Sequence, residues 1–126
     1  MSFTNYLENK IVGHVFGGAA FTAPAALYVA LFTAAPGETG GGTEVTGGSY
    51  ARREFAFTVT GSQAANTDLE EWDAATADWG TVTHAGVFDA SSAGNLLAYA
   101  ALTTARNVLN GDIFRVAAGN LTISLD

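Results

Sequence analysis

Residues 78–126 read DWGTVTHAGVFDASSAGNLLAYAALTTARNVLNGDIFRVAAGNLTISLD, and this stretch decides the fold. Runs of strand-forming residues follow one another in it, and only turn-forming residues separate the runs. Asn110 and Gly111 give a strong signal for a two-residue hairpin loop, because both residue types tolerate a positive φ. This succession of short strands and tight turns predicts an antiparallel β domain.

The pattern of strands continues toward the N-terminus. ALYVALF, residues 26–32, is apolar on both faces, as a central buried strand is. Residues 55–59 alternate between apolar and polar side chains, which predicts a strand with one core face. Gly86 interrupts the alternation of a strand at residues 81–89, where we expect a bulge. The chain is therefore expected to be mainly β, with about six to eight strands in an antiparallel β-sandwich or a jelly-roll-like barrel.

The first segment of the chain has a different period. In residues 2–16 apolar side chains recur every four residues, which predicts a helix. Ser2 can cap the start of this helix, and the glycine pair at 17–18 can end it. Two interpretations remain open at this point. The helix either packs on the domain's own sheet or forms an amphipathic arm that docks on a neighbouring subunit.

Length and composition indicate one folded domain over residues 1–126, with the helix in 1–18 and the β-sandwich in 26–126. The 126 residues are 48% hydrophobic and 13% charged, which predicts a real core and argues against disorder. Five basic against twelve acidic residues give a net charge of −7, and only Arg52 and Arg53 are adjacent cations. We therefore expect no nucleic-acid partner and no membrane partner, and no apolar run approaches the roughly 20 residues that span a bilayer.

Residues 34–49 form a loop-like segment, AAPGETGGGTEVTGGS, with six glycines and no periodicity. Loops of this length are usually functional or disordered. The segment is either a contact loop that orders on a partner or a flexible hairpin connection. Glu38, Gly41 and Glu44 are its candidate partner-contact residues.

Two tryptophans flank the acidic stretch at residues 73–78. Trp72 and Trp79 can act as sugar-stacking platforms or interface anchors, since aromatic side chains near loops serve both purposes. Packing in the core explains them equally well. They complete the set of candidate contact residues.

The sequence offers little chemistry. His14 and His84 have no ligand-type partner at metal spacing, so we expect no metal site. The carboxylates at residues 70–78 indicate a solvated acidic rim rather than a pair of catalytic acids. The glycine run at 40–42 is not followed by the Lys-Ser/Thr of a phosphate-binding loop. We therefore expect no catalytic residue, no cofactor and no enzymatic activity.

Several stretches resemble a family of small virion proteins of tailed bacteriophages. They are YLENKIVGHVFGG with the following FTAPAALYVALF, EVTGGSYAR at 44–52, ATADWGTVTHAGVFDA at 75–90, GNLLAYAAL at 94–102 and AAGNLTISL at 117–125. Proteins of this kind are often labelled tail-fibre proteins, and proteins of this size and β content also serve as capsid cement. The resemblance covers most of the chain except residues 55–73.

The resemblance implies a structural role in the virion, with assembly in the host cytoplasm. The first expectation is a capsid decoration (cement) protein that binds the major capsid protein on the outer shell as a homotrimer. The alternative is a tail-associated or tail-fibre protein that binds a tail protein and contacts host surface glycans. A fibre shaft needs repeats or a long extended segment, which the chain lacks, so the sequence favours the cement role.

Overall fold

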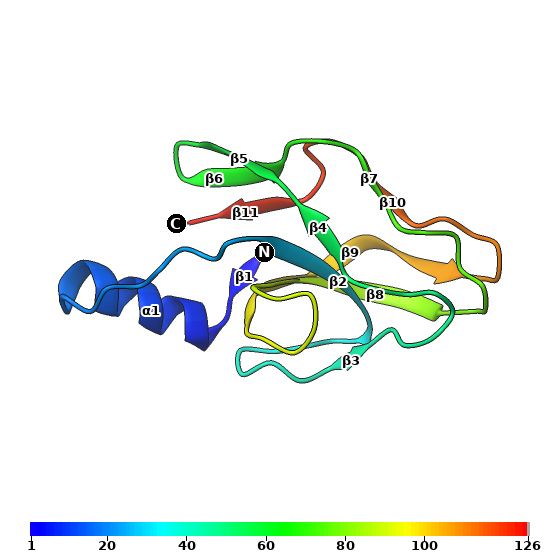
Figure 1. Cartoon of the computed structure of the whole chain (residues 1–126), viewed down its shortest axis with the longest axis horizontal. Helices are drawn as coiled ribbons and strands as arrows, with labels where there is room; N and C mark the ends of the chain where they lie inside the picture. Colours follow the sequence, from blue (N-terminus) through cyan, green and yellow to red (C-terminus); the bar gives the residue numbers. More distant parts are fainter. Residues whose placement is uncertain (126) are drawn as a thin grey trace.

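The computed structural model describes residues 1–125, which form one helix and eleven strands (Figure 1). The largest sheet is antiparallel and has six strands, in the order β1-β9-β8-β2-β3, with β4 also paired to β2. Its strands are β1 (Ser2–Phe3), β2 (Leu27–Ala34), β3 (Thr43–Glu44), β4 (Arg53–Phe55), β8 (Gly80–Phe88) and β9 (Leu96–Val108).

Two small antiparallel sheets form the second layer. The first has the order β11-β6-β5, and the second pairs β10 with β7. Their strands are β5 (Phe57–Thr60), β6 (Gln63–Asn66), β7 (Glu70–Glu71), β10 (Arg115–Val116) and β11 (Thr122–Ser124). Figure 1 shows this layer along one side of the large sheet. The mainly β, sandwich-like antiparallel fold is therefore confirmed, although several strands are shorter and more numerous than expected.

Strand β2 lies at the centre of the core, as its sequence predicts. All four residues of 29–32 are buried, and Val29 and Leu31 join the main core cluster between the layers. On the opposite face of the sheet Phe32 stacks on Phe88, with ring centroids 6.3 Å apart. The continuous apolar run thus reflects burial on both faces of one strand.

The alternation at residues 55–59 does not form a single strand. Phe55 ends β4 in the large sheet, whereas Phe57 begins β5 in the second layer. The chain crosses between layers here, and Val59 is 71% exposed instead of joining the core. The prediction of one strand with one core face was wrong because the sequence does not reveal this crossing.

Close packing, and not a bulge, explains why residue 86 is a glycine. The register shifts of β8 fall between Val82 and His84 and between Val87 and Phe88. A Cβ atom at Gly86 would lie 2.7 Å from Leu96 Cδ1. The strand needs glycine here because a neighbouring side chain occupies the space.

The predicted hairpin at Asn110 and Gly111 is only a turn. The amide of Asp112 donates to the carbonyl of Leu109 at 2.9 Å, and Gly111 has a φ of 93°. The flanking strands β9 and β10 do not pair, since β10 pairs with β7. The local turn signal was correct, but the strand partner was wrong.

The N-terminal helix, α1 (Asn5–Phe16), starts later than predicted. Ser2 does not cap it, because residues 2–3 form β1 against β9. Thr4 is the N-cap: its Oγ1 accepts from the amide of Leu7 at 3.4 Å and donates to the carbonyl of Leu96 at 2.6 Å. This buried threonine fixes the base of the helix to the large sheet.

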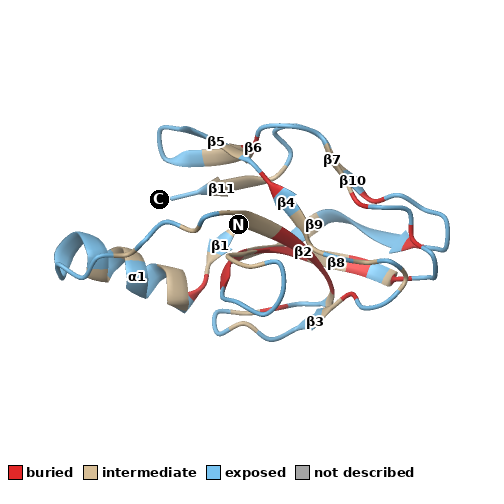
Figure 2. Cartoon of the chain, viewed as in Figure 1, coloured by how far each residue is buried: buried red, intermediate tan, exposed pale blue. Residues whose placement is uncertain are grey.

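Beyond its base α1 projects away from the sheets (Figure 1). None of its twelve residues is buried, as the pale and tan colouring in Figure 2 shows. The interpretation that the helix packs on the domain's own sheet was therefore wrong. Its apolar side chains include Val12, Val15 and Phe16, which are 57%, 62% and 84% exposed.

Candidate partner-binding cleft

The glycine-rich segment at residues 34–49 folds back onto β2. Glu44 and Thr43 of β3 pair with Phe32 and Ala34, and the amide of Val45 donates to the carbonyl of Leu31 at 3.0 Å. Farther out, paired backbone hydrogen bonds of 2.8 and 2.9 Å join residues 37 and 40. The segment therefore has structure of its own, and its two interpretations, a contact loop or a flexible hairpin connection, stay predictions.

Two side chains hold Glu44, which is itself a residue of this segment. Arg52 donates to both of its carboxylate oxygens, at 2.9 and 3.0 Å, and Tyr50 donates its hydroxyl at 2.7 Å. The arginine side chain is only 8% exposed and the glutamate 25%. Two charge-assisted bonds in this geometry fix the carboxylate firmly. The carboxylate of Glu44 is thus engaged by hydrogen bonds from Arg52 and Tyr50 of the same chain.

Tyr50 also supports the main sheet. Its hydroxyl oxygen accepts a 3.0 Å hydrogen bond from the amide of Leu31 in β2. Burial, opposed by this backbone hydrogen bond and reinforced by the bond to Glu44, raises the pKa of Tyr50 far above its ordinary value. The phenol therefore stays protonated and links the glycine-rich segment to β2.

Arg52 also holds a second loop, residues 89–95. Its guanidinium lies 3.6 Å from the ring centroid of Phe88, and its Nη1 donates to the carbonyls of Ala90 and Ala93 at 3.0 and 2.8 Å. Within the loop, both carboxylate oxygens of Asp89 accept from Asn95, at 2.7 Å from its backbone amide and 3.0 Å from its side chain. One arginine therefore positions two segments that are distant in sequence.

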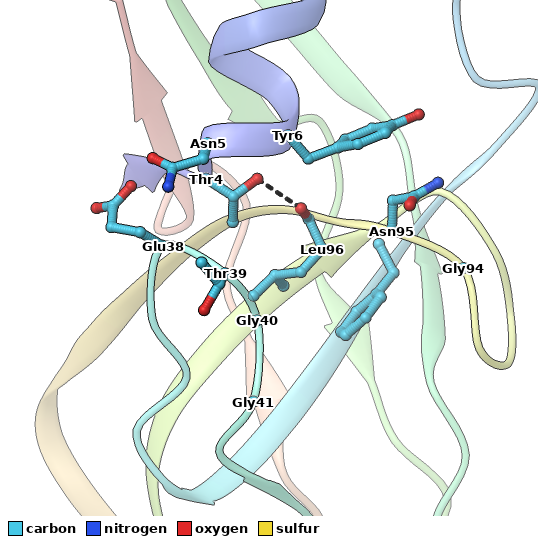
Figure 3. Close-up of a pocket in the computed structure, with 11 residues that line it drawn as sticks. Thr4, Asn5, Tyr6, Glu38, Thr39, Gly40, Gly41, Gly94, Asn95 and Leu96 are labelled. Carbon is cyan, nitrogen blue, oxygen red and sulfur yellow. Dashed lines mark hydrogen bonds between the residues drawn. The ribbon is translucent and has the colours of Figure 1, made fainter.

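A cleft of about 450 Å³ lies between these two loops and the base of α1. Figure 3 shows Glu38 and Thr39 on one side, with Tyr6 and Asn95 on the other. Its lining comprises Thr4, Asn5, Tyr6, Glu38, Thr39, Gly40, Gly41, Phe88, Gly94, Asn95 and Leu96. Three separate parts of the chain thus build one concave surface.

Glu38 is fixed at the rim of this cleft. Its backbone carbonyl accepts from the amide of Asn5 at 3.0 Å, and its Oε1 accepts from the hydroxyl of Tyr99 at 2.7 Å. The hydrogen bond to Glu38 raises the pKa of the Tyr99 hydroxyl above its ordinary value.

The cleft offers polar and aromatic groups to a ligand. Amides, a carboxylate and the ring of Tyr6 can hydrogen-bond and stack against a polyhydroxyl or peptide ligand. Across residues 1–125, no group of three or more His, Asp or Glu side chains is placed to hold a metal ion. The acidic residues predicted as a rim include Glu70 and Glu71, which pair with Arg53 and Arg115 at 3.4 and 3.5 Å.

The structure separates the five candidate contact residues. Glu38 and Gly41 line the cleft, whereas Glu44 is not among the cleft residues and binds Arg52. Trp72 and Trp79 are buried, at 3% and 6% exposure. Neither indole is accessible as a sugar platform or an interface anchor in this conformation, and the core-packing explanation applies to both.

Each tryptophan has defined neighbours in the core. Trp72 packs edge-on to Phe114 with ring centroids 5.4 Å apart, and its Nε1 has no hydrogen-bond partner among residues 1–125. Trp79 packs edge-on to Tyr50 at 5.4 Å, and its Nε1 donates to the carbonyl of Gly48 at 2.8 Å. Trp79 therefore fixes the C-terminal end of the glycine-rich segment at Gly48.

Sequence reasoning missed the other cleft residues. Asn5 and Tyr6 are at the start of a helix, and Phe88 and Asn95 flank a turn, so no local motif connects them. Their meeting depends on β9 lying between β1 and β8, which only the sheet order reveals.

Comparison with known proteins places the chain in a family. The one helix in residues 1–125, α1, is neither long enough nor apolar enough to cross a membrane. No curated protein matches the sequence. The family model described as podophage GP4 fiber I protein gp80 matches residues 2–124. The chain therefore belongs to this family of podophage fibre proteins, which are structural proteins of the virion.

Proposed function

We propose that this chain is a non-enzymatic fibre subunit on the outside of the virion that joins a tail protein and presents the cleft to a ligand. The match over residues 2–124 to a fibre family carries this proposal. The sequence analysis placed this fibre role second, after capsid decoration. The net charge of −7 suits a surface remote from packaged DNA, because like charges repel.

The arrangement of the titratable groups supports a non-enzymatic role. Glu44, Glu70 and Glu71 each pair with an arginine, which leaves none of them free as a general acid or base. Tyr50 and Tyr99 have raised pKa values, mainly from burial in the first and from the hydrogen bond to Glu38 in the second, so neither phenol is activated. These side chains hold loops in place.

The contact that we assign to the cleft is with a surface glycan of the host. Asn95 and Glu38 offer donors and acceptors for sugar hydroxyls, and Tyr6 offers an aromatic face. Replacing Glu38 and Asn95 by alanine should abolish binding to host cells. Alanine at the exposed Glu54 of β4, outside the cleft, is the matched control.

A capsid decoration protein is the second candidate function. It is favoured by the shape of residues 1–125, since their single sandwich contains no shaft and no repeat along which a fibre extends. In that role the partner is the major capsid protein. Binding would stabilise the shell through mass action, and several contacts per oligomer would add avidity.

Particles that lack this chain test the proposal. We expect them to retain their DNA on heating as wild-type particles do, but to adsorb poorly to cells, and purified protein should restore adsorption. Normal adsorption together with DNA release at lower temperature would overturn the fibre role in favour of decoration. Particles that are normal in both assays would contradict both functions.

A further inference from the structure

The projecting helix carries an exposed apolar face that the domain does not cover. Val12, Val15 and Phe16 are spaced i, i+3 and i+4, so they share one face of α1, and Glu8 lies one turn earlier on the same face. A twelve-residue helix is marginal in water without packing. We define the helix patch as Glu8, Val12, Val15 and Phe16.

The same molecule has a groove of about 620 Å³ beside β9, between the two layers of the sandwich. Three partly exposed apolar side chains line its walls: Leu102 of β9, Val116 of β10 and Leu121, which directly precedes β11. The buried ring of Phe114 also lines it. The second layer does not fill this part of the sandwich, which leaves apolar surface open to a partner.

Charge is complementary between the helix patch and the groove. Arg106 and Arg115 line the groove in a protein that has only five basic residues. Arg115 pairs loosely with Glu71 at 3.5 Å, and Arg106 has no salt bridge within residues 1–125. Glu8 likewise has none there. An acidic residue beside an apolar helix face thus matches a basic residue beside an apolar groove.

The helix cannot reach the groove of its own chain. The pairing of β1 with β9 and the bond from Thr4 to Leu96 hold the base of α1, and from there the helix runs away from the sheets (Figure 1). Met1, on the other side of this anchor, already lines the groove. A helix held in this way can meet this groove only in another copy of the chain.

We propose that the helix patch of one subunit docks in the β9 groove of a second copy, with Glu8 against Arg106. The contact joins two different surfaces, so it forms a ring if the rotation closes and an open filament if it does not. We expect the closed homotrimer. The interface is independent of whether the subunit stands on a fibre or on the shell.

Substitutions at two exposed apolar residues test the patch. The full chain should associate with increasing concentration in sedimentation equilibrium. Phe16→Asp should weaken association at least roughly 10-fold, because a charge enters an apolar contact. Val59→Asp is the control, since Val59 is 71% exposed on β5 outside the patch and groove, and it should associate normally. A monomer at all concentrations, or equal effects of both substitutions, would overturn the proposal.

Charge exchange tests the assigned pair. Glu8→Arg and Arg106→Glu should each weaken association, and the double variant should recover most of the loss because the opposite charges meet again. Both positions are exposed, so the monomer should retain its thermal midpoint. Failure of the double variant to recover would exclude Glu8 against Arg106 and with it the proposed docking geometry.

The absence of cysteine from the chain allows a direct test of the contact. A variant with Phe16→Cys and Leu102→Cys should form disulfides between copies under mild oxidation and give covalent trimers. The matched variant with Val59→Cys and Leu102→Cys should remain uncrosslinked. Covalent products of equal yield from both variants, or from neither, would show that the helix end does not enter the groove.

Discussion

Arg52 is the side chain whose removal should disturb the cleft most. It binds Glu44 through two atoms, donates to the carbonyls of Ala90 and Ala93, and packs on the ring of Phe88. Arg52→Ala removes all of these contacts from a side chain that is 8% exposed. Both walls of the cleft lose their shared support.

The expected loss follows from these contacts. Breaking a buried ion pair by removing one partner costs about 3–5 kcal/mol, and the cation–π contact adds about 0.5–2 kcal/mol. Glu44 is 25% exposed and keeps its bond to Tyr50, so water and the phenol offset part of the loss. We expect the free energy of unfolding to fall by about 3 kcal/mol. Arg52→Lys should lose most of that too, because an ammonium cannot bind in two directions and stack at once.

Chemical denaturation followed by tryptophan fluorescence measures this loss, since both indoles are buried. Arg115→Ala is the control: its pair with Glu71 is longer, at 3.5 Å, and more exposed, at 58% and 42%, so it should cost less than about 1 kcal/mol. Hydrogen exchange should also accelerate in residues 37–42 and 89–95 of the Arg52→Ala variant. Equal costs for the two substitutions would refute the central role of Arg52.

Three other predictions concern the core and pH. Because the pKa of Tyr50 is raised in the fold, this tyrosine loses its proton at lower pH in the unfolded chain than in the folded chain. The contribution of Tyr50 to the free energy of unfolding should therefore be complete below about pH 10 and fall above it by up to about 1.4 kcal/mol per pH unit. Denaturation midpoints measured against pH should show this slope, and Tyr50→Phe should flatten it. Gly86→Ala should cost about 1–3 kcal/mol in thermal unfolding, since the new Cβ would meet Leu96 Cδ1 at 2.7 Å. Asn66→Ala should cost about 3 kcal/mol, because three backbone partners of this buried side chain lose a hydrogen bond; a loss under about 1 kcal/mol would show that water replaces it.

Local sequence patterns predicted the class of fold and the central strand. The apolar run at 26–32 and the succession of turns in residues 78–126 are local patterns, because side-chain alternation and turn conformation depend on adjacent residues. The same local patterns could not predict which strands pair with each other. Asn110 and Gly111 form a turn, yet β10 pairs with β7, which precedes it by more than forty residues.

The candidate site was predictable only in part. Glu38 and Gly41 lie in a segment whose composition marked it as unusual, and they line the cleft. Glu44 could not be separated from them, because its binding to Arg52 depends on how the segment folds onto β2. For Trp72 and Trp79 the sequence left surface contact and core packing equally open, and both rings lie in the core. The exposure of an aromatic side chain is set by tertiary packing.

The most direct test of the account is to locate this chain on intact, purified particles with gold-labelled antibodies against it. A fibre subunit should label the fibres of the tail on every particle, and the label should survive washing in high salt. Label spread over the head would contradict the fibre role and support decoration. Particles without any label, from a preparation in which the free protein is readily labelled, would contradict the claim that the chain is a structural part of the virion.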